Sequence, residues 1–389
     1  MSPLEISLAL AIACVLYIYA FYPALVAVLA RVLGRPVDRS GPRPKSISIA
    51  IPAHNEETSI ARRLNEFSRL VGRSGLQAEI IVVSDGSTDR TAAIAKEAAC
   101  GCQLRVVELP YRVGKAVALS QGCALAEHEI IVLADARQHW AADALDHLLA
   151  NFGDPAVGAV TGELVLESAP GVLAGVGVYW RFEKWLRKQE SRWFSTVGVT
   201  GAICAVRREL FCPVPEDTLL DDVYWPIRVT MQGRRVVHDA AAIAYDRLPA
   251  RPRDEFRRKV RTLSGNFQLV ARLPSALQPW RNPVWLQFVS HKLMRLLVPW
   301  ALLIILASSF LLPGAIYQAF FWAQVAFYGL GLIGFATAWG APFKLASLAS
   351  SFLMLNSAAW LAFWVWVSGN AGRTWEKAFE PVPSGETAA

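Results

Sequence analysis

The sequence predicts an α/β domain with a mainly parallel, Rossmann-like sheet, flanked on both sides by transmembrane helices. Between residues 45 and 165, short runs rich in β-branched residues recur about every 20 to 30 residues with helix-like stretches between them. This rhythm is typical of βαβ units. No charged residue occurs over 6–30 or 296–343. Each of these stretches can cross a bilayer, which takes about 20 apolar residues.

The first element, residues 1–33, is interpreted as a retained transmembrane anchor. The alternative is a cleaved signal peptide, which has a basic start and an apolar core of about 7–15 residues. The first seven residues carry Glu5 and no basic side chain, and the apolar run is longer than that. Five basic residues follow the anchor: Arg31, Arg35, Arg39, Arg43 and Lys45. The positive-inside tendency therefore places residue 31 onward in the cytoplasm.

Composition supports a chain that is partly embedded in lipid. Hydrophobic residues make up 54% of the 389 residues and charged residues 18%, which is too apolar for two soluble domains. The net charge of +7 could indicate nucleic-acid binding, but the chain has no nucleic-acid motif and no basic helix with interleaved aromatic residues. Attraction of juxtamembrane cations to anionic lipid explains the charge better, so we expect no nucleic-acid partner.

Residues 40–275 form the predicted globular domain, with strands expected over 46–51, 79–83, 104–109 and 129–133. Ligands of parallel sheets bind beyond the carboxyl ends of the strands. Polar residues gather at these ends, in 52–57, 84–89 and 134–138. Each cluster alone could be a turn or a helix N-cap. Together they predict a site at one edge of the sheet.

After this domain, 278–295 is predicted to be an amphipathic helix in the membrane interface. Its cations, His291, Lys292 and Arg295, are expected to meet lipid phosphates. The transmembrane region 296–372 then holds spans near 296–313, 315–338 and 345–369, followed by a tail over 373–389. Three spans would leave the tail outside, whereas its basic residues favour the inside. Either one segment is re-entrant or a loop is misassigned.

The polar clusters form an ordered series of motifs along the chain. The series runs Ile51-Pro-Ala-His-Asn-Glu-Glu57, Val82-Val-Ser-Asp-Gly-Ser-Thr-Asp-Arg-Thr91, Gly114-Lys-Ala116, Leu133-Ala-Asp-Ala-Arg-Gln138, Thr200-Gly-Ala-Ile203, Leu220-Asp-Asp-Val223 and Arg257-Arg-Lys-Val-Arg-Thr262. In order and spacing it resembles family 2 glycosyltransferases, which have a GT-A fold. The resemblance covers most of residues 46–270. The apolar flanks resemble membrane-bound members such as cellulose, chitin and hyaluronan synthases.

The resemblance implies a nucleotide-sugar site. Ala53, Glu57 and Asp85 would surround the nucleobase and ribose, with Asp85 accepting a hydrogen bond from uracil. Lys115 would lie near the donor pocket. Asp135 matches the first acid of the Asp-x-Asp motif, which in the family holds the nucleotide-sugar and a divalent cation. Mg²⁺ or Mn²⁺ suits this role because a hard cation prefers carboxylate oxygens and neutralises the leaving diphosphate.

The resemblance also implies an acceptor side. Thr200, Gly201 and Ala202 match the segment that forms the floor of the acceptor site. Asp222 matches the general base, although Leu-Asp-Asp replaces the family's Thr-Glu-Asp and leaves Asp221 as the alternative. A hydroxyl is a weak nucleophile until a positioned carboxylate takes its proton. One base opposite the leaving diphosphate gives a single displacement with inversion.

The sequence departs from the family pattern at two further motifs. Arg137 replaces the second acid of Asp-x-Asp, which leaves metal dependence open. Its guanidinium either clamps the diphosphate in a bidentate manner or pairs with an acid such as Asp143. Of the Gln-x-x-Arg-Trp motif only Arg261 is kept. The loss of the stacking Trp favours a short or lipid-linked acceptor over a long extruded polymer.

The predicted function is inverting transfer of a sugar from a nucleotide-sugar, a UDP-sugar by preference, to a lipid-linked or oligosaccharide acceptor at the membrane. The predicted location is a bacterial inner membrane, with the GT-A domain in the cytoplasm. One alternative is a processive exopolysaccharide synthase that extrudes its product. Another is a membrane scaffold subunit with a degenerate domain, which Arg137 favours and the retained Asp85, Asp135, Asp222 and Arg261 oppose.

Overall fold

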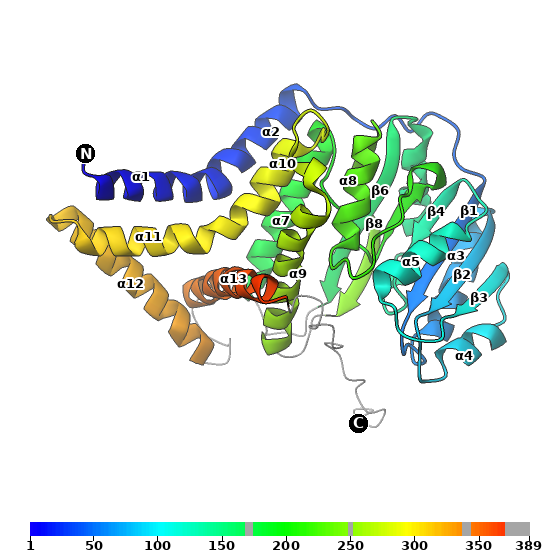
Figure 1. Cartoon of the computed structure of the whole chain (residues 1–389). Helices are drawn as coiled ribbons and strands as arrows, with labels where there is room; N and C mark the ends of the chain where they lie inside the picture. The colour runs from blue at the N-terminus through cyan, green and yellow to red at the C-terminus, as the bar shows by residue number, and fades with distance from the viewer. Residues whose placement is uncertain (168–173, 248–251, 337–343, 370–389) are drawn as a thin grey trace.

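A mixed eight-stranded sheet forms the centre of the globular domain (Figure 1). The computed structural model describes residues 1–167, 174–247, 252–336 and 344–369. The strand order is β3-β2-β1-β4-β7-β6-β8-β5. The four predicted strands are β1 (Ser46–Ala53), β2 (Gln77–Ser84), β3 (Gln103–Glu108) and β4 (Ile130–Leu133). They pair in parallel, which confirms the predicted α/β fold class with its mainly parallel first half.

The second half of the sheet is mixed. Its strands are β5 (His139–Trp140), β6 (Val157–Glu167), β7 (Cys204–Arg207) and β8 (Arg235–Arg247). Strand β7 is antiparallel to both β4 and β6, whereas β6 and β8 are parallel to each other. The short β5 pairs antiparallel with β8. The antiparallel β7 joins the two halves into one continuous sheet.

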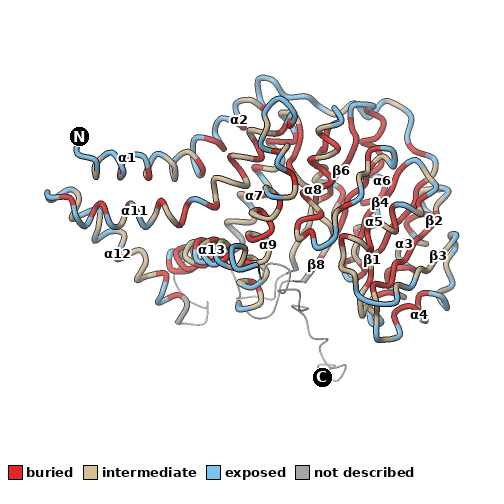
Figure 2. The backbone as a smooth tube through the Cα atoms, viewed as in Figure 1, coloured by how far each residue is buried: buried red, intermediate tan, exposed pale blue. Residues whose placement is uncertain are grey.

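Helices cover both faces of the sheet because apolar residues alternate along the strands. Ile47, Ile49 and Ile51 of β1 face a core under α3 (Ile60–Ser74), α4 (Thr91–Glu97) and α6 (Ala144–Ala150). Ala50 faces the opposite core, under α5 (Lys115–Ala124) and α8 (Asp221–Met231). These buried residues appear as the red strands inside the right-hand half of Figure 2. Short 3₁₀ turns lie at Asn151–Gly153, Arg208–Leu210 and Pro274–Leu277.

Four helices in the described residues are long and apolar enough to cross a membrane. The first, Pro3–Val32, combines α1 (Pro3–Leu16), a π turn (Tyr17–Phe21) and α2 (Tyr22–Val32). The others are Trp285–Leu311, Ala315–Gly334 within α12 (Ala315–Ala336), and Leu345–Val367 within α13 (Lys344–Val367). In Figure 1, α1 runs beside α11 (Val298–Leu311). Large apolar side chains on these helices stay exposed, as suits contact with hydrocarbon.

The predicted interfacial segment does not stand apart from the first C-terminal span. Its helical turns are α10 (Trp285–Gln287), a π turn (Phe288–Leu293) and a 3₁₀ turn (Met294–Leu297), which lead directly into α11. The expectation that His291 and Arg295 meet lipid phosphates is wrong. Both side chains face α7 (Ala174–Trp193), where they pair with buried glutamates. The predicted tail, 373–389, lies outside the described residues.

A buried ionic cluster attaches the span Trp285–Leu311 to the globular domain. His291 Nε2 lies 3.0 Å from Glu183 Oε2, and its Nδ1 lies 2.8 Å from Glu190 Oε1. Arg295 also donates to Glu183, and the Tyr22 hydroxyl donates to Glu190 at 2.6 Å. The cluster therefore joins α2, α7 and the beginning of the second apolar span, Trp285–Leu311.

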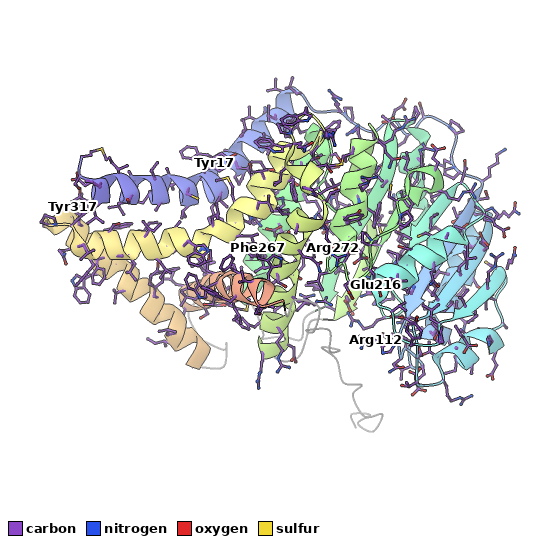
Figure 3. All side chains as sticks on the ribbon, viewed as in Figure 1. Tyr17, Arg112, Glu216, Phe267, Arg272 and Tyr317 are labelled. Atoms are coloured by element: carbon purple, nitrogen blue, oxygen red, sulfur yellow. The ribbon has the colours of Figure 1, made fainter. Side chains whose placement is uncertain are left out.

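A second attachment runs through α9 (Pro252–Arg272), which packs against α13. Val260 contacts Ala358 and Ala362 in one apolar cluster. Phe267 stacks on Trp366, with ring centroids 5.5 Å apart. Figure 3 shows Phe267 between the two helices. The long helix α9 thus links a membrane helix to the globular domain.

We expect Glu183→Ala to destabilise the protein by about 3–5 kcal/mol, because the change leaves Arg295 without its buried carboxylate partner and removes one of the two carboxylates that contact His291. Thermal unfolding in detergent would measure the loss. As a control, Glu127→Ala removes a solvent-exposed ion pair with Arg105 and should cost no more than about 1 kcal/mol. Equal losses in the two variants would contradict this account of the attachment.

Candidate active site

Parallel register brings the predicted polar clusters to one edge of the sheet. Ala53 of β1 is level with Ser84 of β2, and Ala50 is level with Leu133 of β4. The segments that follow these strands therefore leave the sheet at the same edge. Antiparallel pairing sets Cys204 opposite Leu133. The residues just before β7, which include 200–202, consequently lie next to the end of β4.

A crevice with an empty volume of about 250 Å³ opens at this edge. Its charged side chains are Lys115, Asp135, Asp221 and Asp222, which come from three separate stretches: the start of α5, the segment after β4 and the start of α8. The full lining is Pro52, Lys115, Leu119, Leu133, Ala134, Asp135, Val199, Gly201, Cys204, Asp221, Asp222 and Trp225. Three carboxylates and one ammonium group therefore share a small space with apolar walls.

Lys115 is at the centre of this charge cluster. It is the first residue of α5, and its Nζ lies 2.6 Å from Asp135 Oδ1. Desolvation alone would lower the pKa of Lys115, but the negative charges of Asp135 and Asp221 outweigh it and raise the pKa. A Cβ at position 201 would lie 3.1 Å from Lys115 Nζ. Glycine at 201 thus leaves room for the lysine beside the floor segment.

Asp221 and Asp222 begin α8, where the helix dipole favours negative charge. The Val199 amide donates to the Asp222 carbonyl at 2.8 Å, which fixes the start of α8 against the segment 199–202. Desolvation raises the pKa of Asp221. Desolvation and the neighbouring Asp221 charge raise the pKa of Asp222 to about 6. Asp222 can therefore exchange a proton near neutral pH.

Two arginines predicted for the site differ in position. Arg261, on α9, interacts electrostatically with Asp221 and Asp222; desolvation lowers its pKa, while these acids act in the opposite direction. Arg137 lies outside the crevice lining and its Nη2 binds Asp246 of β8 at 2.8 Å. Arg137 thus pairs with an acid, as one alternative had it, but the acid is Asp246 and not the suggested Asp143, which contacts His147. Among the described residues, no group of three or more His, Cys, Asp or Glu side chains could hold a metal.

The predicted base-binding residues form a separate group beside the crevice. The Ala53 carbonyl accepts from the Asp85 amide at 2.8 Å, and Glu57 accepts from the Arg90 amide at 3.1 Å. The buried Asp85 carboxylate accepts from the amides of Val113 and Gly114, at 2.7 and 3.0 Å. Because Gly114 directly precedes Lys115, Asp85 fixes the loop that begins α5.

Sequence reasoning missed some contributors to this region. Trp225 and Leu119 form apolar walls of the crevice, and their only sequence signal is ordinary core hydrophobicity. Asp246 carried no signal, because its partner lies 109 residues away in sequence. Of the predicted residues, the structure gathers Lys115, Asp135, Gly201, Asp221 and Asp222 in one crevice. Ala53, Glu57, Asp85, Arg137, Thr200, Ala202 and Arg261 do not line it.

The chain is similar to known glycosyltransferases in sequence. Residues 48–212 match the model of glycosyl transferase family 2. A probable glycosyltransferase, YdaM of Bacillus subtilis (strain 168), is 28% identical over 237 residues, or 58% of this chain and 56% of the relative. Poly-beta-1,6-N-acetyl-D-glucosamine synthase of Staphylococcus aureus (strain COL) is 22% identical over 249 residues, or 62% and 60%. The matches thus span less than two thirds of these curated relatives.

The fold has a solved counterpart over nearly its whole length. The mannosyltransferase PcManGT of Pyrobaculum calidifontis, solved with GDP-Man and Mn²⁺, superposes with a TM-score of 0.68. The superposition covers 93% of this chain and 99% of the mannosyltransferase, at 24% sequence identity. Both the sheet and the flanking apolar helices therefore belong to a known architecture.

We expect Asp85→Ala to loosen the loop before α5, because it removes the acceptor of two backbone amides. Hydrogen exchange at Val113 and Gly114 should accelerate by about tenfold to a hundredfold. Asp143→Ala is the matched control, because Asp143 contacts only the surface residue His147 and its loss should leave these amides unchanged. Unchanged exchange in Asp85→Ala would contradict the assigned role.

Proposed function

Because this chain is a glycosyltransferase with a family 2 domain, we propose that it transfers a sugar with inversion from a nucleotide-sugar to an acceptor at the membrane surface. The observation that carries the proposal is the crevice in which Asp222 lies near the Lys115–Asp135 pair. One carboxylate there is suited to accept a proton, while a cation is suited to stabilise a leaving diphosphate.

In the proposed reaction, Asp222 takes the proton of an acceptor hydroxyl as its oxygen attacks the anomeric carbon. A new carbon–oxygen bond forms while the bond to the diphosphate breaks, and the electron pair leaves with the nucleoside diphosphate. The pKa of about 6 supports this role, because the carboxylate is largely ionised at neutral pH yet still basic. A single displacement inverts the anomeric centre.

The chain's own cations are the first groups proposed to stabilise the negative charge on the leaving diphosphate. Lys115 lies at the centre of the crevice, and Arg261 acts on the same carboxylates. Only Asp135 remains of the family's metal motif, so the residues fit a cation held by one carboxylate together with the donor's phosphates. They do not fit a cation held by the protein alone. Such a cation would supply additional neutralisation of the phosphates.

Donor and acceptor are proposed at the level of chemical class. The Asp85 segment supports a nucleotide site, and a UDP-sugar is our preferred donor. A lipid-linked or short saccharide acceptor fits the four apolar helices and the absence of a Trp after Arg261. The similarity to a poly-N-acetylglucosamine synthase supports a processive synthase as the second candidate. The proposed location is a bacterial inner membrane, with the domain in the cytoplasm.

We expect Asp222→Asn to lower kcat about a hundredfold to ten-thousandfold, because the amide cannot accept the acceptor proton. The dissociation constant of UDP, measured by calorimetry, should stay near that of the native protein. Asp221→Asn serves as the control and should retain most of the turnover. The opposite ranking of the two variants would assign the base to Asp221.

The pH profile provides a second readout of the same residue. The base must be ionised, and the pKa of Asp222 lies near 6. Transfer should therefore fall as pH decreases through about 6, approaching tenfold per pH unit. Asp222→Asn should lack this acidic limb. A profile that stays flat down to pH 4 would exclude Asp222 as the base.

We expect Mn²⁺ to bind the protein measurably only when a nucleoside diphosphate is present, because Asp135 alone offers too few ligands. Electron paramagnetic resonance of free Mn²⁺ would follow the titration with and without UDP or GDP. Asp135→Asn should weaken the nucleotide-dependent binding. Saturable binding of Mn²⁺ without nucleotide would show that the protein builds a complete site itself.

A further inference from the structure

Besides Lys115 and Arg261, two further cations act on Asp222. These are Arg187 of α7 and Lys292, which lies near the start of the span Trp285–Leu311. Burial raises the pKa of Asp222, whereas the positive charges of Lys292 and Arg187 lower it. Neither cation is needed to hold the donor in the proposed reaction. Both come from elements on the membrane side of the domain.

Arg187 is fixed by the floor of the crevice. Its Nη1 donates to Thr200 Oγ1 at 2.9 Å, and the Thr200 amide in turn donates to Thr161 Oγ1 at 2.8 Å. Thr200 directly precedes Gly201 of the crevice lining. Arg187 is half-buried, and the hydrogen bond to Thr200 uses only one of its five N–H donors.

Lys292 is brought to the same place by its neighbour in the chain. His291 is buried and bridges Glu183 and Glu190. These glutamates flank Arg187 at spacings of four and three residues, so all three lie on one face of α7. Lys292 follows His291 directly and interacts electrostatically with Glu183 and Arg187 of this face and with Asp222.

Within the described part of the chain, Arg187 and Lys292 have no carboxylate within ion-pair distance. The two glutamates nearby are already engaged, Glu183 by Arg295 and His291, and Glu190 by Tyr22 and His291. The one carboxylate that acts on both cations and is not engaged by these partners is Asp222, which is also the proposed base. A further anion between the two cations would offset their mutual repulsion in this partly desolvated place. Their arrangement beside a proposed base therefore indicates an anionic ligand.

We propose that Arg187 and Lys292 bind a phosphate group of the lipid acceptor, which presents its reacting hydroxyl to Asp222. The inference rests on the proposed function and deepens it, because it names the acceptor as a phosphate-bearing lipid. A guanidinium suits a phosphate through paired N–H donors, and an ammonium adds a point charge. Lys292 belongs to a membrane-crossing segment, so the phosphate is held at the level of lipid headgroups.

The test compares two lipids that both carry hydroxyl groups, of which only one carries a phosphate. The full chain in detergent is titrated with phosphatidylglycerol or digalactosyldiacylglycerol, and binding is followed by native mass spectrometry. We expect a preference for phosphatidylglycerol that falls at least about tenfold in R187Q/K292Q. R187K should keep most of it. K188Q, which removes an exposed charge from the same helix, is the matched control and should keep it fully.

Equal binding of both lipids by the native chain would overturn the proposal, as would a preference that survives in R187Q/K292Q. In a third arm, inorganic phosphate at matched concentration competes with phosphatidylglycerol for binding. Competition as strong as that of the lipid itself would also overturn the proposal, because the site would then bind free phosphate. Calorimetric binding of UDP or GDP in the same samples tests the donor site. Loss of nucleotide binding would count against the proposed function. If nucleotide binding is retained, a failure to prefer the phosphate-bearing lipid contradicts only the inference about Arg187 and Lys292.

Discussion

Lys115 is the charge on which the crevice depends, because Asp135, Asp221 and Asp222 share a partly desolvated space with it. Without a central cation, three carboxylates in one small crevice would take up protons. They would then lose the negative charges that the proposed reaction needs. The position of Lys115 is itself set by the proposed nucleotide-binding group, since the Asp85 carboxylate accepts from the amide of Gly114. The two halves of the site are therefore joined through the first turn of α5.

Helix α7 connects the crevice to the membrane helices through a single face. Glu183 and Glu190 on that face bind His291, while Arg187 between them binds Thr200 of the crevice floor. Along this face of α7, the two glutamates that attach the membrane segment therefore lie on either side of the arginine that contacts the crevice floor. This arrangement explains why a domain with its own sheet and two cores is nevertheless joined closely to the bilayer-crossing part of the chain.

The sequence was informative where local patterns decide the structure. The strands ending at Ala53, Ser84 and Leu133 could be predicted, because β-branched runs followed by turn residues in parallel strands must end at one edge. Partners distant in sequence could not. Asp246 reaches Arg137 only through the antiparallel β5–β8 pairing, and nothing near His291 indicates that Glu183 and Glu190 surround it. Pairing between residues distant in sequence depends on the assembled fold. In the sequence alone, the cations of 278–295 are equally consistent with a surface that faces lipid headgroups.

The packing of α9 on α13 connects a membrane helix to the helix that carries Arg261. Phe267 stacks on Trp366 of α13. Arg261, whose charge acts on Asp221 and Asp222, lies six residues earlier on α9. Helices adjust to a thinner or thicker membrane by tilting, at a cost of only fractions of a kcal/mol per Å of mismatch. Because α9 packs on α13, a tilt of α13 also displaces α9, the helix that carries this arginine.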